Sequence, residues 1–279
     1  MKKISRRSFL AAAGLSVAAL ALTACGGSSA STASSVASSA ASSEAASTSA
    51  AAGELTTVEA GKLTMATNAA FPPYEMTTDA GEFEGIDIET AQAIADKLGL
   101  ELQIDDMDFD AALLSVQQGK ADIVMAGVTV TDERKAVMDF SDSYATCIQS
   151  IIVPEGSDIA SPDDLAGKKI GTQRGTTGYI YCSDDFGDDN VVAYDDGLTA
   201  VQALNNGQVD AVVIDNAPAQ EFVAANPGLV ILDTSYAEED YAIGMAKGSS
   251  LEDAVNATLE ELKADGTLQA IVDKYITAE

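Results

Sequence analysis

Two stretches of the chain share one pattern, and a residue of opposite charge follows each of them. Residues 111–124 and 199–212 both read as an amphipathic helix, a glycine that ends it, and an aspartate that leads into an apolar strand. Thr129 and Arg134 come shortly after the first stretch, and Asp215 follows the second. Because ligands of open α/β sheets sit beyond the carboxyl ends of strands, these three residues are candidates for one binding site.

The two charged candidates suit a zwitterion. The guanidinium of Arg134 is a rigid fork that fits a carboxylate, and the carboxylate of Asp215 fits an ammonium group. A buried zwitterion needs both partners, because an unpaired buried charge costs several kcal/mol. Each residue also has an ordinary alternative role: Arg134 could pair with Asp132 or Glu133 at the surface, and Asp215 could cap the helix that follows it.

Two turns and two aromatic residues extend the candidate site. Residues 173–178 link a predicted strand to a helix and can direct N–H groups at an anion, although they lack the lysine of a P-loop. Residues 68–75 follow the first predicted strand, and their two prolines stiffen a turn that could hold Phe71 against the cleft. Phe109 opens the first repeated helix. Without further support, either phenylalanine is more typical of a hydrophobic core.

The elements that would position these residues alternate as in α/β proteins. The body has about 225 residues, enough for two modest domains with separate cores. The repeat favours two similar lobes, although helix–glycine–strand units also recur by chance. Strands are predicted at 62–67, 101–104, 121–126, 149–153, 169–171, 191–194, 211–214 and 230–232, and helices at 87–98, 109–118, 177–183, 198–205, 218–225, 251–264 and 268–275.

The N-terminal region is typical of an exported protein. A cationic start and an apolar run at 9–22, too short to span a bilayer, predict a signal peptide over residues 1–24. Residues 22–25 resemble a bacterial lipobox, which predicts a lipid on Cys25; the alternative is an ordinary signal with a free cysteine. Residues 5–10 also resemble a twin-arginine signal, so the export route stays open. Residues 26–53, rich in serine and alanine, should form a flexible linker.

Composition excludes several classes of function. The chain has 15 basic and 44 acidic residues and no histidine, a formal net charge of −29. Such a charge should repel nucleic acid and anionic lipid. Without histidine, a zinc site or a neutral-pH proton shuttle is disfavoured, and we expect no metal and no cofactor. Outside the cytoplasm, Cys147 and Cys182 could form a disulfide, or they could be two buried thiols.

Several motifs in a fixed order resemble the amino-acid-binding proteins of ABC importers, which are solute-binding protein family 3 with the type-II periplasmic-binding fold. The similarity runs from about residue 63 to 275. Two positions depart from the family: Thr90 stands where an aliphatic residue is usual, and Asn68 where many members have aspartate. The motifs are at 68–75, 85–89, 108–109, 126–134, 139–144, 175–178 and 213–215.

The resemblance implies a two-lobed α/β fold in which each lobe is a mixed sheet flanked by helices. Residues 54–146 and 241–279 would form one lobe, and residues 147–240 the other. Two hinge crossovers, near 145–149 and 238–242, would let the lobes close on a ligand.

The resemblance also implies a role for each candidate residue. Arg134 would bind the ligand α-carboxylate, assisted by N–H groups near Thr129 and Thr177. Asp215 would bind the α-ammonium, together with the Gly127 carbonyl and the Thr129 hydroxyl. The residues around the ligand side chain would be Phe71 and Phe109, with Asn68, Gln173 and Ile214 setting selectivity. Residues 85–89 would serve helix packing and capping.

The expected function is extracytoplasmic binding, without catalysis, of a polar or basic L-amino acid by a monomer held to the membrane by a lipid. The ligand would be delivered to the transmembrane subunit of an ABC importer. One alternative is a dehydratase on the same fold, for which Glu75 is the most obvious proton donor. Another is a sensor subunit that reports the amino acid to a signalling partner.

Overall fold

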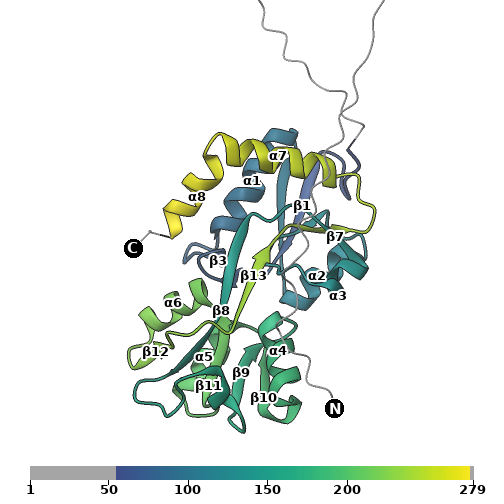
Figure 1. Ribbon diagram of the computed structural model, residues 1–279. Coiled ribbons are helices and arrows are strands. Elements are labelled where there is room, and N and C mark those ends of the chain that lie inside the picture. The colour runs from purple at the N-terminus through teal and green to yellow at the C-terminus, as the bar shows by residue number, and fades with distance from the viewer. Residues whose placement is uncertain (1–54, 277–279) are drawn as a thin grey trace, which may run out of the picture. The chain divides into compact units, whose positions relative to one another are not determined.

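The structure is a computed structural model, and it describes residues 55–276. The predicted signal peptide 1–24, the predicted lipidation site Cys25 and the predicted linker 26–53 lie outside the described residues. Among the described residues, no helix is both long and apolar enough to cross a membrane. The described residues belong to one compact unit, Ser49–Glu279, in which two lobes are visible (Figure 1).

The first lobe is built on a five-stranded sheet in the order β5-β1-β6-β14-β7. Strand β1 pairs in parallel with β5 and β6, and β14 pairs antiparallel with β6 and β7. A small antiparallel sheet, β2-β3-β4, carries the turn that begins at Asn68. The strands of this lobe are β1 Lys62–Thr67, β2 Ala70–Phe71, β3 Glu75–Thr77, β4 Phe83–Glu84, β5 Glu101–Asp106, β6 Ile123–Val124, β7 Met138–Phe140 and β14 Gly244–Ala246; its helices are α1 Ile86–Leu98, α2 Phe109–Gln117, α3 Asp132–Val137, α7 Glu252–Ala264 and α8 Thr267–Tyr275.

The second lobe repeats this plan around a sheet in the order β10-β9-β11-β8-β12. Strand β9 pairs in parallel with β10 and β11, whereas β8 runs antiparallel to β11 and β12. The strands are β8 Ala145–Pro154, β9 Ile170–Gln173, β10 Val191–Tyr194, β11 Ala211–Asp215 and β12 Leu229–Ile231; the helices are α4 Thr177–Phe186, α5 Gly197–Asn205 and α6 Asn216–Ala225, with short 3₁₀ turns at Pro162–Leu165 and Asp188–Asn190.

Two strands run between the lobes side by side (Figure 1). Strand β13, Ala237–Tyr241, pairs antiparallel with the first half of β8, so that Glu239 lies opposite Cys147 and Tyr241 opposite Ala145. The N–H of Tyr144 donates to the Tyr241 carbonyl at 3.0 Å, which holds the pair together at the first lobe. This ribbon occupies the segments expected for the two crossovers.

The repeated sequence pattern folds in the same way in both lobes. Helices α2 and α5 each end two residues before a glycine with positive φ, at Gly119 (φ 65°) and Gly207 (φ 67°). The N–H that follows each glycine then donates back to the helix at 2.9 Å, from Lys120 to Ser115 and from Gln208 to Ala203. Each helix stop therefore sends the chain into the strand whose end carries candidate site residues.

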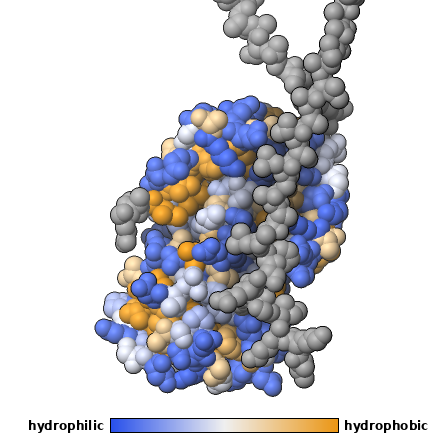
Figure 2. All heavy atoms as spheres, viewed as in Figure 1, coloured by the Kyte–Doolittle hydropathy of each residue, from blue (hydrophilic) through white to orange (hydrophobic). Residues whose placement is uncertain are grey.

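Most of the apolar side chains are buried in these lobes. Helix α2 buries one face against β1, β6 and β14, and α5 does the same against β9 and β11. Figure 2 shows hydrophilic residues over most of one face of the molecule, with smaller hydrophobic patches on both lobes. This distribution is the one expected from an acidic chain that packs its apolar side chains in the interior.

The disulfide considered from the sequence is not formed. Cys147 and Cys182 are both free and buried. The physical reason is their placement: Cys147 packs in the core cluster that contains Tyr144 and Tyr241, whereas Cys182 packs in a separate cluster with Ile151. They are the two buried thiols of the alternative interpretation.

Candidate ligand-binding site

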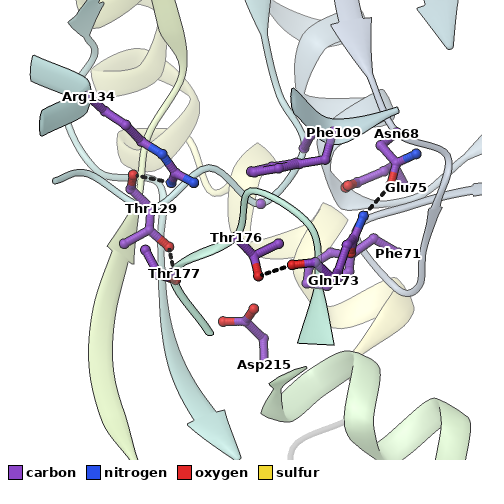
Figure 3. Close-up of a pocket in the computed structure, with 12 residues that line it drawn as sticks. Asn68, Phe71, Glu75, Phe109, Thr129, Arg134, Gln173, Thr176, Thr177 and Asp215 are labelled. Carbon is purple, nitrogen blue, oxygen red and sulfur yellow. Dashed lines mark hydrogen bonds between the residues drawn. The ribbon is translucent and has the colours of Figure 1, made fainter. Parts of the chain in front are cut away.

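One cavity is lined by residues of both lobes and contains nine of the ten residues predicted around the ligand (Figure 3). The cavity is narrow: the space open to the centre of a water molecule is about 10 Å³. Three of the lining residues, Glu75, Ala126 and Thr176, were not predicted as ligand contacts. The other nine are the predicted ones: Asn68, Phe71, Phe109, Gly127, Thr129, Arg134, Gln173, Thr177 and Asp215. The structure thus brings these nine together, and their contacts with a ligand stay predictions.

Arg134 enters the cavity from the start of α3. Its N–H donates to the Thr131 hydroxyl at 3.2 Å, which caps this short helix. The guanidinium donates from Nη1 to the Thr129 carbonyl at 2.7 Å and from Nη2 to the Gly175 carbonyl at 3.1 Å. It also lies 5.3 Å from the centre of the Phe109 ring. Arg134 is therefore held in place by groups of both lobes.

The guanidinium has no acidic partner among the described residues. None of the ion pairs found in residues 55–276 involves Arg134, and the surface pairing with Asp132 or Glu133 is absent. Only 8 % of Arg134 is exposed, and this burial lowers its pKa, while the Glu239 charge acts in the opposite direction. A buried guanidinium that forms only neutral hydrogen bonds is suited to accept a ligand carboxylate.

Asp215 stands at the end of β11, on the other lobe. It occupies the N-cap position of α6 but makes no capping hydrogen bond with its side chain, so the capping alternative does not hold. Its Oδ1 accepts from Gln149 Nε2 at 3.0 Å. Burial raises the pKa of Asp215 to about 6. No lysine or arginine among residues 55–276 forms an ion pair with it, which leaves its charge available to a ligand ammonium.

Beside Asp215 lies a polar network that sequence reasoning missed. Glu239 Oε2 accepts from Gln149 Nε2 and from Thr177 Oγ1, both at 2.9 Å, and Glu239 Oε1 accepts from Tyr181 at 2.8 Å. The Sγ atom of Cys147 and one carboxylate oxygen from each of Asp215 and Glu239 lie within 4.8 Å of one another. The carboxyl groups of Asp215, in the cavity wall, and of Glu239, behind it, make this part of the site acidic, which favours a cationic group there.

Gly127 is held tightly where the first repeated strand ends. Its φ is +55°, and a Cβ atom there would come within 2.9 Å of the Phe71 ring and 3.2 Å of Tyr241. Its N–H donates to Asp87 Oδ2 at 3.0 Å. Asp87 does not line the cavity, but it fixes a loop that does. Only glycine combines this backbone conformation with so close an approach to Phe71.

The amide side chains of Gln173 and Asn68 form a hydrogen-bonded pair that closes one side of the cavity. Gln173 Nε2, on the second lobe, donates to Asn68 Oδ1, on the first, at 2.8 Å, and Asn68 in turn donates to the Met107 carbonyl at 3.0 Å. Phe71 and Phe109 are both buried and line the cavity near this pair. Ile214 does not line the cavity, which corrects the prediction for it: its side chain packs in the core, against the position of Gly197.

The comparison with known proteins decides the family. Residues 63–278 match the bacterial extracellular solute-binding proteins, family 3. The chain belongs to this family. The two-lobed α/β fold agrees with this assignment, because solved amino-acid-binding proteins that resemble the chain have the same fold.

Three relatives of this family illustrate the similarity. The L-cystine-binding protein TcyJ of Escherichia coli (strain K12) is 32% identical over 225 residues, which cover 79% of this chain and 85% of TcyJ. The arginine-binding extracellular protein ArtP of Bacillus subtilis (strain 168) is 33% identical, covering 78% of this chain and 87% of ArtP. The solved arginine-, lysine-, histidine-binding protein ArtJ of Geobacillus stearothermophilus has a TM-score of 0.75 at 34% identity, covering 78% of this chain and 96% of that chain.

Proposed function

We propose that this protein binds a free L-amino acid outside the cytoplasm and delivers it to an ABC-type importer. The observation that carries the proposal is the pair Arg134 and Asp215, which line one cavity from opposite lobes, each buried and each without an ion-pair partner among residues 55–276. An amino acid supplies both missing charges at once. The relatives' names, which specify cystine, arginine, lysine and histidine as ligands, support the same class of ligand.

Closure of the two lobes would couple binding to delivery. Direct contacts already cross the cavity, from Arg134 to the Gly175 carbonyl at 3.1 Å and between the Thr129 and Thr177 hydroxyls at 3.5 Å. A ligand that bridges Arg134 and Asp215 would add its own contacts to these and shift the population towards the closed form. The ribbon of β8 and β13 is the segment that would bend. We infer that the protein binds the amino acid without converting it, because its family is one of solute-binding proteins.

A thermal-shift screen against the twenty L-amino acids tests the proposed function. A ligand at 100 times its Kd stabilises the native state by about 2.7 kcal/mol, so at least one amino acid should raise Tm by about 5–10 °C. The deaminated acid of the same side chain serves as the control and should give a much smaller shift, because it offers nothing to Asp215. If none of the twenty changed Tm, amino-acid binding would have to be abandoned.

We further propose that the mature protein begins at Cys25 and is held to the membrane by a lipid. Residues 1–24 would be removed on export, residues 26–53 would form the tether, and the lobes would comprise 54–146 with 241–279 and 147–240. The body would act as a monomer. Cys25→Ala should shift the protein from the membrane fraction to the soluble fraction of expressing cells. An unchanged membrane fraction would argue against the lipid.

A further inference from the structure

Glu239 is a buried carboxylate to which the assignment of the ligand's two charges to Arg134 and Asp215 gives no role. It lies on β13 and is 9 % exposed. Neighbouring residues of a strand point to opposite faces, so Glu239 turns inward while Glu238 is exposed. Glu239 is not one of the residues that line the cavity. We therefore expect it to influence a ligand through the residues that it contacts.

The backbone holds Thr129, a residue of the cavity wall, close to Glu239. Thr129 forms an antiparallel bridge with Tyr241, which follows Glu239 on β13. The N–H of Val130 donates to the Asp240 carbonyl at 3.0 Å and continues this pairing. Main-chain contacts thus bring Thr129 and Glu239 together where the first lobe meets the ribbon that runs between the lobes (Figure 1).

Four side chains from different parts of the fold donate to Glu239. Its Oε2 accepts from the Thr177 hydroxyl at 2.9 Å and from the Thr129 hydroxyl at 3.4 Å. The same atom accepts from Gln149 Nε2 at 2.9 Å, and Oε1 accepts from the Tyr181 hydroxyl at 2.8 Å. An ionised carboxylate can only accept hydrogen bonds, so the hydrogen in each of these contacts belongs to the partner.

These contacts decide which way the two threonine hydroxyls point. A hydroxyl has one hydrogen, and that of Thr177 is used by Glu239. The hydrogen of Thr129 can go to Glu239 or to Thr177 Oγ1, 3.5 Å away, and Figure 3 shows the two hydroxyls turned towards each other. In either case the hydrogen of Thr129 is directed at this pair. The lone pairs of its oxygen remain for a donor in the cavity.

The same network reaches Asp215, the other acceptor of this part of the cavity. Gln149 Nε2 donates both to Asp215 Oδ1, at 3.0 Å, and to Glu239 Oε2. Asp215 and Thr129 both line the cavity, and both are joined to Glu239 by hydrogen bonds. One buried carboxylate thus connects the two cavity groups that can accept from a ligand ammonium.

We propose that Glu239 is a positioning residue that fixes the Thr129 hydroxyl as a hydrogen-bond acceptor for the ligand α-ammonium. The inference rests on the proposed function and adds a residue to its site. An ammonium carries three hydrogens, and Asp215 and Thr129 can each accept one of them. A carboxylate in the same place would meet the lone pairs of Thr129. Glu239 therefore helps to set which end of the amino acid binds at Asp215 and which at Arg134.

Replacing Thr129 tests the role of its hydroxyl. The probes for calorimetry are the L-amino acid that binds most tightly among the twenty and the acid that lacks its α-amino group; for L-arginine this acid is 5-guanidinopentanoate. Thr129→Val, which has the same shape without the hydroxyl, should weaken the amino acid by at least about tenfold and the deaminated acid by less than about threefold. Thr129→Ser keeps the hydroxyl and should stay within about threefold of the wild type for both.

Replacing Glu239 tests its action through Thr129. Glu239→Gln puts a donor in place of one acceptor oxygen, and Glu239→Asp keeps the charge but withdraws the oxygens by one methylene. Both should weaken the amino acid by about tenfold and leave the deaminated acid no weaker than in the wild type. In the Thr129→Val protein, either change should cost less than about threefold, because the hydroxyl to be positioned is already gone.

Glu238→Gln is the matched control, because it makes the same chemical change at the exposed neighbouring position of β13. It should alter neither affinity. Thermal unfolding shows which variants fold, and Glu239→Asp replaces Glu239→Gln if the latter does not.

Three results would overturn the inference. Equal losses of the amino acid and its deaminated acid in Thr129→Val would mean that the hydroxyl serves the ligand carboxylate. Wild-type affinity in a folded Glu239 variant would remove that residue from binding. Additive losses in the double variants would mean that Glu239 acts independently of Thr129. Each of these leaves the proposed function standing, whereas a wild-type protein that binds none of the twenty amino acids would refute the proposed function itself.

Discussion

Arg134→Ala should weaken binding of the preferred L-amino acid by about a thousandfold, because removing one partner of a buried ion pair costs about 3–5 kcal/mol. The ligand carboxylate would enter a site in which Thr129 and Gly175 present carbonyl oxygens, and these cannot donate to it. Isothermal calorimetry on the purified variant measures the loss.

A surface arginine provides the matched control for this experiment. Arg174 lies in the neighbouring turn and pairs at 3.7 Å with Asp195, and both side chains are largely exposed. Arg174→Ala should therefore leave the affinity unchanged. Thermal unfolding should show that both variants fold. Near-normal affinity in a folded Arg134→Ala protein would mean that the carboxylate binds elsewhere.

Asp215→Asn should weaken L-amino acids by about 100-fold while affecting their deaminated analogues far less, because only the amino acids carry an ammonium that needs this charge. Burial raises the pKa of the Asp215 carboxyl to about 6, so we also predict that the affinity for amino acids depends on pH. Protonation removes its negative charge, so the affinity of the wild-type protein for amino acids should fall as the pH is lowered through 6.

The variant should lack the part of this pH dependence that Asp215 causes. Asp195→Asn, the same change in the exposed pair with Arg174, should retain wild-type affinity and its pH profile. Titrations from pH 5 to 8 with the amino acid and its deaminated analogue measure both effects. Equal losses for the two ligands would take Asp215 out of the ammonium role.

Much of the site could be predicted from sequence because its residues follow local signals. The repeated helix–glycine–strand pattern predicted where two strands end, and both helix stops have the expected glycine geometry at Gly119 and Gly207. Arg134 and Asp215 follow those strands, one in the sheet of each lobe, and ligands of open α/β sheets bind beyond the carboxyl ends of strands. The family motifs supplied the aromatic and amide residues, which no local pattern distinguishes from core.

The missed residues depend on long-range pairing. Glu239 sits in the acidic run 238–240, which resembles a solvated segment, and only its register with Cys147 on β8 turns it inward. Gln149, on the same ribbon, reaches Asp215 and Glu239 for the same reason. Such pairing between distant segments is not encoded in either one alone. The short strands β7 and β14 were missed for a related reason, because three residues give too little alternation to recognise.

Two corrections have equally simple causes. Ile214 precedes Asp215 directly, and neighbouring residues of a strand point to opposite faces, so both could not line the cavity. For Cys147 and Cys182, the spacing of two cysteines in a sequence says nothing about the distance between them. The structure packs them in different parts of the core.

The most direct test of the central claim is a crystal structure of the protein with the tightest ligand from the amino-acid screen. It should show the ligand α-carboxylate hydrogen-bonded to the guanidinium of Arg134 and the α-ammonium in contact with the carboxylate of Asp215, inside the cavity of Figure 3. A ligand bound outside this cavity, or one that leaves either residue without contact, would contradict the account.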